Sequence, residues 1–319
     1  MKKISIMICS IFLSVLFFPQ AVFAWGTAVH VLVSYHILPY IEIEQDDLHK
    51  MNAMNMNQAY GGLAPDTFNY QFDTKSSLLQ VQTHTNFLEV WDTAKSVPEK
   101  ALAFGFLVHN YADFTAHNAG QTIGQGEGYV TAKANILKGY LVSIPEYQSL
   151  SIPDTVTAVI AHILVENGVD LLMKTIDPKI GEKIVTASLP PNPNFPLLLV
   201  KAYGDDLSNS AGISKSEAAK LIRSSGREFQ KINVLYGHAL MQDDALDLIS
   251  QQMADFALSF LSANGIILPE GTDLVPLARI GIIKAMDVCV PDFQAEVMAT
   301  ISHVENQLEA NQISYNQKK

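Results

Sequence analysis

The stretch FGFLVHNYADFTAHNAG, from Phe104 to Gly120, constrains this chain more than any other. Within it His109, Asp113 and His117 recur at every fourth position. Residues four apart lie on one face of an α-helix, a turn apart, so the spacing predicts a helix with three potential metal ligands in a row. Zinc prefers imidazole and carboxylate, and a central carboxylate has two oxygens with which to bridge neighbouring ions. The alternative is a helix with a half-polar face that carries two histidines, and a motif this short does not decide between them.

The spacing of apolar residues elsewhere indicates an all-α protein. Apolar residues recur mostly three and four positions apart, and alternating β-branched residues are scarce. Two capping boxes, Ser96–Glu99 and Ser214–Glu217, predict helix starts, the first for the central helix through His117. Other expected helices are Val29 to Leu38, Gln45 to Gln58, one from Asp154 that carries Ile160 to Met173, one through Phe260, Leu274 to Val288 and Phe293 to Leu308. A glycine-rich loop is expected from Gly120 to Gly128, and the proline-rich run from Leu189 to Pro196 is expected to break the chain.

The first 24 residues are typical of a secretory signal peptide. Lys2 and Lys3 precede an apolar run from Ile4 to Phe18, and small residues follow at the positions that a signal peptidase reads. We therefore expect cleavage after Ala24, export of the protein, and Trp25 as the mature N-terminus. The alternative is an uncleaved membrane anchor, but the apolar run is shorter than the ~20 residues that a spanning helix needs. No later window is expected to span a bilayer.

Charge and cysteine content narrow the classes of function. The formal net charge is −11, and loss of the two signal-peptide lysines would make it more negative by two. Nucleic-acid binders normally present a basic face, so nucleic acid is the less expected partner. Of the two cysteines, Cys9 would leave with the signal peptide, so Cys289 would have no intrachain partner. Packing and, in this interpretation, bound metal would supply the stability.

Further candidate metal ligands lie on both sides of the central helix. The freed amino group and the carbonyl oxygen of Trp25 can chelate a metal, and His162 and Glu166 are spaced so that one helix can offer both to one ion. Each has an ordinary alternative: a histidine at the edge of the core, a helix cap, or a solvated pair. The full candidate set is Trp25, His30, Asp66, His84, His109, Asp113, His117, His162 and Glu166.

In order and residue type, these candidates resemble the metal ligands of the bacterial zinc-dependent phospholipases C. The resemblance covers Trp25 to Glu166. It implies an all-α fold of the phospholipase C and zinc nuclease kind, with a trinuclear zinc site. It also implies residues 25–189 as the catalytic region and residues 190–319 as a C-terminal helical region, in the same domain or accessory to it.

The resemblance also implies which residue holds which ion. One zinc would be held by Asp66, His84, His109 and Asp113, and a second by His117, His162 and Glu166. The third would be held by the backbone of Trp25, by His30 and by a shared oxygen of Asp113. The pKa of the attacking water would fall from 15.7 to about 7 on zinc. Asp66 is a candidate to help deprotonate it while acting as a ligand, and a free carboxylate is the alternative.

Local departures from the phospholipase C pattern leave the substrate open. In HNYADFTAH the spacing from Asp113 to His117 is short, and this form is more similar to the phospholipase C/D domain of glycosylphosphatidylinositol-specific phospholipase D. The short spacing from Trp25 to His30 is more similar to that of the single-strand-specific zinc nucleases, and position 28 is Ala where some phospholipases C carry an acidic residue. The overall resemblance, together with the acidic chain, implies a phospholipid phosphodiesterase with peripheral contact to a membrane surface. A zinc nuclease and a non-catalytic, zinc-stabilised exported protein are the alternatives.

Overall fold

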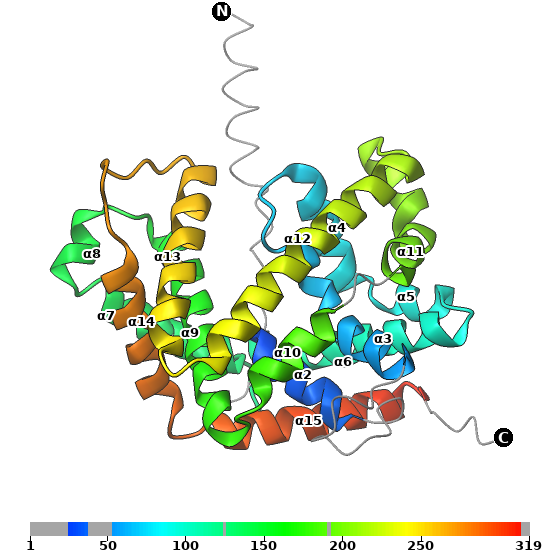
Figure 1. Ribbon diagram of the computed structural model, residues 1–319, viewed down its shortest axis with the longest axis horizontal. Helices are drawn as coiled ribbons and strands as arrows, with labels where there is room; N and C mark the ends of the chain where they lie inside the picture. Colours follow the sequence, from blue (N-terminus) through cyan, green and yellow to red (C-terminus); the bar gives the residue numbers. More distant parts are fainter. Residues whose placement is uncertain (1–24, 38–52, 124–125, 190–192, 314–319) are drawn as a thin grey trace, which may run out of the picture.

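The computed structural model describes residues 25–37, 53–123, 126–189 and 193–313, and these residues form helices and no strand (Figure 1). The predicted signal peptide lies outside the described residues. The shorter elements are α3 (Ala53–Gly61), η2 (Ala64–Phe68), α5 (Leu88–Thr93), α8 (Pro145–Ser149) and α10 (Ile180–Ser188). The longer ones are α2 (Thr27–His36), α4 (Thr74–Thr85), α6 (Val97–His117), α7 (Tyr129–Leu141), α9 (Asp154–Ile176), α11 (Asn194–Ala211), α12 (Lys215–Met241), α13 (Ala245–Ala263), α14 (Val275–Cys289) and α15 (Phe293–Ala310). The all-α prediction is confirmed.

Helix α6 lies at the centre of the fold and carries the His109 to His117 row. It begins at the predicted capping box, in which Ser96 Oγ accepts from the Glu99 backbone N–H and Glu99 Oε2 accepts from the Ser96 backbone N–H. The helix packs against α2, α3, α5, α7, α11 and α15. Because it is covered on nearly every side, its polar residues His109 and Asp113 are buried.

Two glycines allow α3 and α6 to touch through their backbones. A Cβ built on Gly105 would lie 2.2 Å from the carbonyl oxygen of Gln58, and one on Gly61 would lie 2.1 Å from the carbonyl oxygen of Leu102. No side chain fits at such distances, so glycine is required at both positions. The close approach brings the carbonyl of Gly62 against α6, where it meets His109.

Helix α9 forms a second buried axis and packs against α2, α7, α10, α13 and α14. Among the described helices, α9 alone is long and apolar enough to cross a membrane by length and composition. This corrects the expectation that no window after the signal peptide has that composition. Its most apolar window of 18 residues is 72% buried inside the protein, as in the central helix of a packed core.

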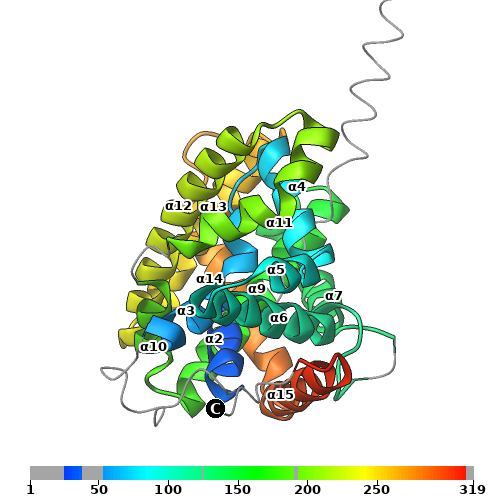
Figure 2. The ribbon, with the colours of Figure 1, turned by 90° about the vertical axis from the view of Figure 1, so that its right-hand side faces the viewer.

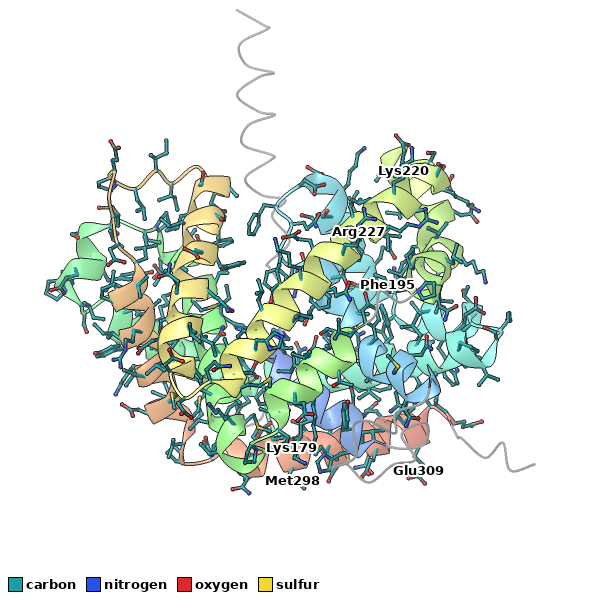
Figure 3. The ribbon with its side chains drawn as sticks, viewed as in Figure 1. Lys179, Phe195, Lys220, Arg227, Met298 and Glu309 are labelled. Atoms are coloured by element: carbon teal, nitrogen blue, oxygen red, sulfur yellow. The ribbon has the colours of Figure 1, made fainter. Side chains whose placement is uncertain are left out.

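The C-terminal helices wrap around these two axes. Helix α15 runs beneath α2 and α6 in both ribbon views (Figures 1 and 2). Helix α12 is amphipathic: Ile222 and Phe229 are buried, whereas Lys220 and Arg227 project from its outer face (Figure 3). The predicted boundary between residues 189 and 190 is not tested by this packing and stays a prediction.

Most predicted helices lie close to their expected positions, with two differences. Residues 45–52 of the expected Gln45 to Gln58 helix lie outside the described residues, and α3 begins at Ala53. The proline-rich break is shorter than predicted, because α11 already begins at Asn194 and includes Phe195 and Pro196. Proline is tolerated in the first turn of a helix, where its missing N–H would have no intrahelical partner.

The Glu99 carboxylate gives the first testable prediction, a dependence of stability on pH. A hydrogen bond from Lys201 and another from the Ser96 backbone lower the pKa of Glu99 from 4.5 to about 2. A depressed native pKa means that this stabilisation is complete above pH 4.5 and is lost as the pH falls toward 2. We expect Glu99→Gln to lower the free energy of unfolding by about 1–2 kcal/mol at pH 7, allowing for solvent screening around the exposed Lys201. Urea unfolding at a series of pH values measures it, and the difference between variant and wild type should vanish in acid.

Glu217 provides the matched control, because it occupies the same position in the capping box of α12. Its carboxylate accepts hydrogen bonds from Ser214. Glu217→Gln should therefore cost less than Glu99→Gln at neutral pH. Equal losses in the two variants would show that the capping box, rather than Lys201, accounts for the effect at Glu99.

Candidate metal centre

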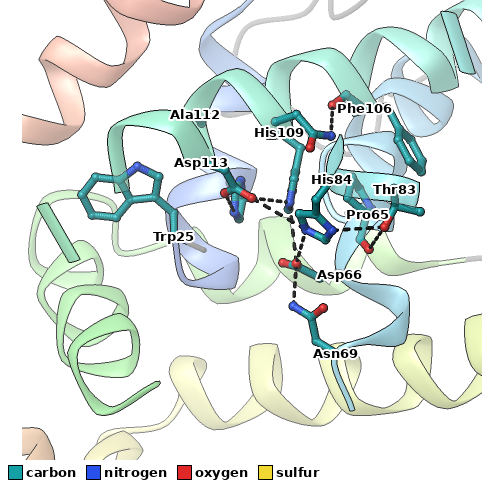
Figure 4. Close-up of polar contacts among 12 residues, drawn as sticks. Trp25, Pro65, Asp66, Asn69, Thr83, His84, Phe106, His109, Ala112 and Asp113 are labelled. Atoms are coloured by element: carbon teal, nitrogen blue, oxygen red, sulfur yellow. Dashed lines mark hydrogen bonds and ion pairs between the residues drawn. The ribbon is translucent and has the colours of Figure 1, made fainter. Parts of the chain in front are cut away.

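Five of the predicted ligands converge from four separate elements (Figure 4). His30 comes from α2, Asp66 from η2 and His84 from α4, while His109 and Asp113 come from adjacent turns of α6. Asp113 lies at the middle of the set. Its Oδ1 is 3.1 Å from His30 Nε2, and its Oδ2 is 3.2 Å from His109 Nε2 and 3.8 Å from His84 Nε2.

Asp66 lies close to two of these three histidines. Its Oδ1 lies 3.3 Å from His84 Nε2 and 3.6 Å from His109 Nε2. The same oxygen accepts a 2.7 Å hydrogen bond from the side-chain amide of Asn69, which fixes the orientation of the carboxylate. Two carboxylates and three imidazoles thus present their ligand atoms to one small volume.

Backbone carbonyls hold two of these rings by their other nitrogen. His109 Nδ1 is 2.9 Å from the carbonyl oxygen of Gly62, and His84 Nδ1 is 2.8 Å from that of Gln80. A carbonyl oxygen can only accept, so Nδ1 carries the hydrogen and Nε2 is directed at the carboxylates. Metal-binding histidines in proteins are commonly oriented by such a hydrogen bond to the other ring nitrogen.

Apart from the ion pairs within the cluster, most of these candidate ligand atoms make no hydrogen bond in the described protein. This holds for Nε2 of His84 and His109, for both ring nitrogens of His30 and for both oxygens of Asp113, all of which are buried. A buried polar group left unpaired costs about 1–3 kcal/mol, and more when it is charged. A metal ion with imidazole and carboxylate ligands would satisfy these atoms, so the residues present fit a metal centre.

The electrostatics of the pocket favour the ionised carboxylates that metal binding requires. Burial alone would raise the pKa of Asp113, but His109 and His30 outweigh it and hold that pKa well below its ordinary value. Burial also opposes ionisation of Asp66, and His109 and His84 again lower its pKa. Burial, with a contribution from His109, lowers the pKa of His30, which favours the neutral ring that binds metal.

His109 carries the opposite perturbation. Burial would lower its pKa, but Asp113 and Asp66 outweigh burial and raise the pKa to about 9. In the metal-free protein this ring is therefore protonated at neutral pH, and its charge balances the two carboxylates. A metal ion would compete with that proton, so binding should release protons.

The described residues form two overlapping groups that could hold metal ions. In each, the ligand atoms all lie within 4.8 Å of one another: His30, His109 and Asp113 form one group, and Asp66, His84 and His109 form the other. His109 belongs to both groups, whereas the resemblance implies it only for the ion held by Asp66, His84 and Asp113. The reason is packing, because the ring of His109 stacks on that of His30 with centroids 3.8 Å apart.

The second predicted set, His117, His162 and Glu166, lies near the first but is less converged. His162 Nε2 is 3.1 Å from Glu166 Oε1, and the rings of His117 and His162 stack with centroids 5.0 Å apart. Burial, and next the charge of Asp66, raise the pKa of Glu166 well above its ordinary value. Neither of the two groups whose ligand atoms lie within 4.8 Å of one another in the described chain includes these residues. Their assignment to an ion therefore stays a prediction.

Trp25 is anchored beside the centre by its side chain. Its indole N–H donates a 3.0 Å hydrogen bond to Thr115, two residues beyond Asp113 on α6, and its ring stacks on Tyr129. This places the residue next to the centre. Chelation by its backbone, as the resemblance implies, stays a prediction.

Sequence reasoning missed Asp170, which fixes the start of α2. Its Oδ2 accepts from the Ala28 backbone N–H at 3.0 Å and from the Tyr236 hydroxyl at 3.0 Å. A Cβ on Gly26 would lie only 2.4 Å from Asp170 Oδ1, so the carboxylate sits directly over that glycine. The available signal was its spacing, since Asp170 follows Glu166 by four residues and extends the polar face of α9.

A cleft of about 390 Å³ opens beside Glu166. Gly26, Thr27 and Asp170 line it near the start of α2, and α12 and α13 supply much of the opposite wall. Its volume is in the usual range for small-molecule sites. The C-terminal region thus contributes directly to the walls of this cleft.

Comparison with known proteins gives no match: no protein-family model, curated protein or solved structure matches this chain. The geometry itself therefore carries the functional argument. What it establishes is an all-helical protein with two overlapping His/Asp groups that could bind metal ions.

Proposed function

We propose that this protein is an exported, zinc-dependent phosphodiesterase that hydrolyses the headgroup phosphodiesters of phospholipids. The observation that carries the proposal is the cluster of buried imidazole and carboxylate atoms around Asp113, most of which make no hydrogen bond outside the cluster. The order of these residues along the chain adds the resemblance to the zinc-dependent phospholipases C. Export rests on the predicted signal peptide.

Zinc is the proposed ion, three in number as the resemblance implies. The donors are imidazole nitrogens and carboxylate oxygens, the set that catalytic zinc sites use. When bound, zinc would supply Lewis acidity toward phosphate oxygens and lower the pKa of a coordinated water. Trp25, His30, Asp66, His84, His109, Asp113, His117, His162 and Glu166 are the proposed ligands.

Asp66 is the proposed general base. Its carboxylate is ionised, is oriented by Asn69, and is partly exposed at 16% of its side chain, whereas Asp113 is more deeply enclosed at 7%. A base has to meet both the attacking water and the solvent that removes the proton. Asp66 fulfils both conditions better than Asp113.

The walls of the cleft favour a lipid over a nucleic acid. Tyr70, Phe72, Ile232 and Leu235 line it, and Leu235 is 53% exposed. The net charge of −11 opposes a polyanion, whereas a zwitterionic headgroup is compatible with it. The aromatic side chains could also stack on bases, so a zinc-dependent single-strand nuclease is the second candidate.

A direct assay separates these candidates. The processed, zinc-loaded protein is incubated with phosphatidylcholine, phosphatidylinositol and single-stranded DNA side by side. Diacylglycerol is the expected product, phosphatidic acid would indicate cleavage on the other side of the phosphate, and nucleotides would indicate the nuclease. Absence of turnover on all three substrates, with zinc bound, would support a purely structural metal site.

Asp66→Asn tests the assignment of the base within the same assay. We expect kcat to fall by roughly 10²–10⁴-fold, the usual contribution of a general base. The exposed Asp206 on α11 provides the matched control, because Asp206→Asn makes the same chemical change away from the cleft. If both variants retain wild-type kcat, Asp66 is not the base.

A further inference from the structure

A second, apolar cavity lies behind the cleft, between α7, α8, α9, α13 and α14. Its volume is about 50 Å³, and its lining is almost entirely carbon. Ile160 and Leu164 of α9, Ala254 and Leu261 of α13, Ala278 of α14 and Leu274, which directly precedes α14, contribute to that lining. Nothing in the proposed hydrolysis uses this cavity.

The cavity and the cleft share part of their walls. Ile163, Met253 and Phe256 line both, so the apolar space begins where the cleft ends. Ile163 directly follows His162 on α9, and Glu166 lines the cleft one turn further along. A molecule whose polar end lay beside Glu166 could therefore extend an apolar end toward the cavity.

Aromatic side chains lie beside the wall that the cleft and the cavity share. Phe72, from the segment after η2, lies 5.9 Å from the rings of both Phe256 and Phe260 on α13. Tyr70 packs edge-on against Phe256 at 5.9 Å. Phe72 nevertheless remains 40% exposed, which is a large fraction for an aromatic residue at the mouth of a cleft.

The size and chemistry of the cavity limit what can occupy it. Its volume is about a third of the ~150 Å³ of an apolar cavity known to hold benzene, so a nucleobase is too large. A base would also bring polar edges that the carbon lining could not satisfy. Methylene and methyl groups have no such requirement and would restore the dispersion contacts that an empty space lacks.

We propose that this cavity receives the end of one hydrocarbon chain of the substrate, and so selects phosphodiesters that carry such a chain. The inference rests on the proposed function, because the cleft is taken to hold the phosphodiester. It adds a chain-binding subsite formed by α9, α13 and α14, with Ile163, Met253 and Phe256 at its entrance.

Calorimetric titration with alkylphosphocholines of increasing chain length, kept below micelle-forming concentrations, measures the subsite directly. Affinity should rise roughly fourfold for each added methylene until the cavity is full, and then level off. Ala254→Leu and Ala278→Leu fill the cavity from two helices. Each should reduce, by at least tenfold, the affinity gained by lengthening the alkyl chain. Ala263→Leu is the matched control, since Ala263 is exposed near the end of α13.

Turnover separates failure of the subsite from failure of the proposed function. With bis(4-nitrophenyl) phosphate, which has no alkyl chain, the two filling variants should keep the wild-type kcat/KM. With short-chain phosphatidylcholines they should lose at least tenfold. Hydrolysis of both substrates by the wild type without dependence on chain length would overturn the subsite alone. If no phosphodiester is hydrolysed, the proposed function fails, and the calorimetric series still decides whether alkyl chains bind.

Discussion

Removing bound metal from the purified protein should lower its melting temperature by a large amount. An ion present at 1,000 times its dissociation constant stabilises the native state by about 4 kcal/mol, which for a chain of this size is roughly 6–7 °C per ion. The reason lies in the pocket: without an ion, the Nε2 atoms of His84 and His109 and both oxygens of Asp113 stay buried with only the cluster's own ion pairs as partners. Differential scanning calorimetry before and after dialysis against a chelator measures the shift.

Restoring the ions should reverse the loss. Back-titration with Zn²⁺ is expected to recover the original melting temperature and to release protons, because the ring of His109 is protonated in the metal-free pocket. A variant with both His238 and His303 replaced by alanine is the control, since neither residue belongs to a metal group. It should respond to the chelator as the wild type does. A melting temperature indifferent to the chelator, together with elemental analysis that finds no metal, would contradict the proposal.

Local signals were sufficient to predict the helices that carry most of the ligands. The capping box at Ser96 and the apolar spacing that follows it predict α6, and the row from His109 to His117 then follows from helix geometry. Asp154 and the apolar run after it similarly predict α9, with His162 and Glu166 one turn apart. Such features are encoded within a few turns of chain.

Helix α4, which carries His84, gave no comparable signal. Its sequence TKSSLLQVQTHT is mostly polar, and its start is fixed by Asp73, whose side chain accepts from the backbone N–H of Lys75 and Ser76. The helix is held by packing against η2 and α11. Tertiary contacts therefore decide a conformation that periodicity alone leaves undetermined.

The orientation of the site depends on contacts between distant parts of the chain. The Gly62 carbonyl reaches His109 only because Gly61 and Gly105 let two helix backbones meet. Asp170 reaches the start of α2 from α9 across 142 positions of sequence. A single sequence gives no sign of such pairs. It therefore predicted candidate ligands but not the contacts that orient them.

Asp113→Asn should lower both the activity and the metal content of this protein. Asp113 is the one described carboxylate within 4 Å of three of the clustered histidines, His30, His84 and His109. An asparagine keeps the shape but supplies one weak oxygen donor in place of two charged ones. We expect kcat/KM to fall by roughly 10³-fold or more, about 4 kcal/mol of transition-state stabilisation. Steady-state kinetics and metal content by elemental analysis check this, with loss of at least one ion per chain expected.

The chelator response of this variant distinguishes a metal ligand from a structural residue. Removing Asp113 also leaves the protonated His109 with fewer counter-charges, so the metal-free variant should itself be less stable than the metal-free wild type. Loss of activity alone would fit either role. If Asp113 is a metal ligand, a second result is expected. In Asp113→Asn, the difference in melting temperature between loaded and chelated protein should shrink to less than half its wild-type value. Asp154→Asn, at an exposed carboxylate paired with Lys138, should leave that difference intact. A full chelator response in Asp113→Asn would place the ions elsewhere, because a ligand cannot be removed without changing the free energy of binding.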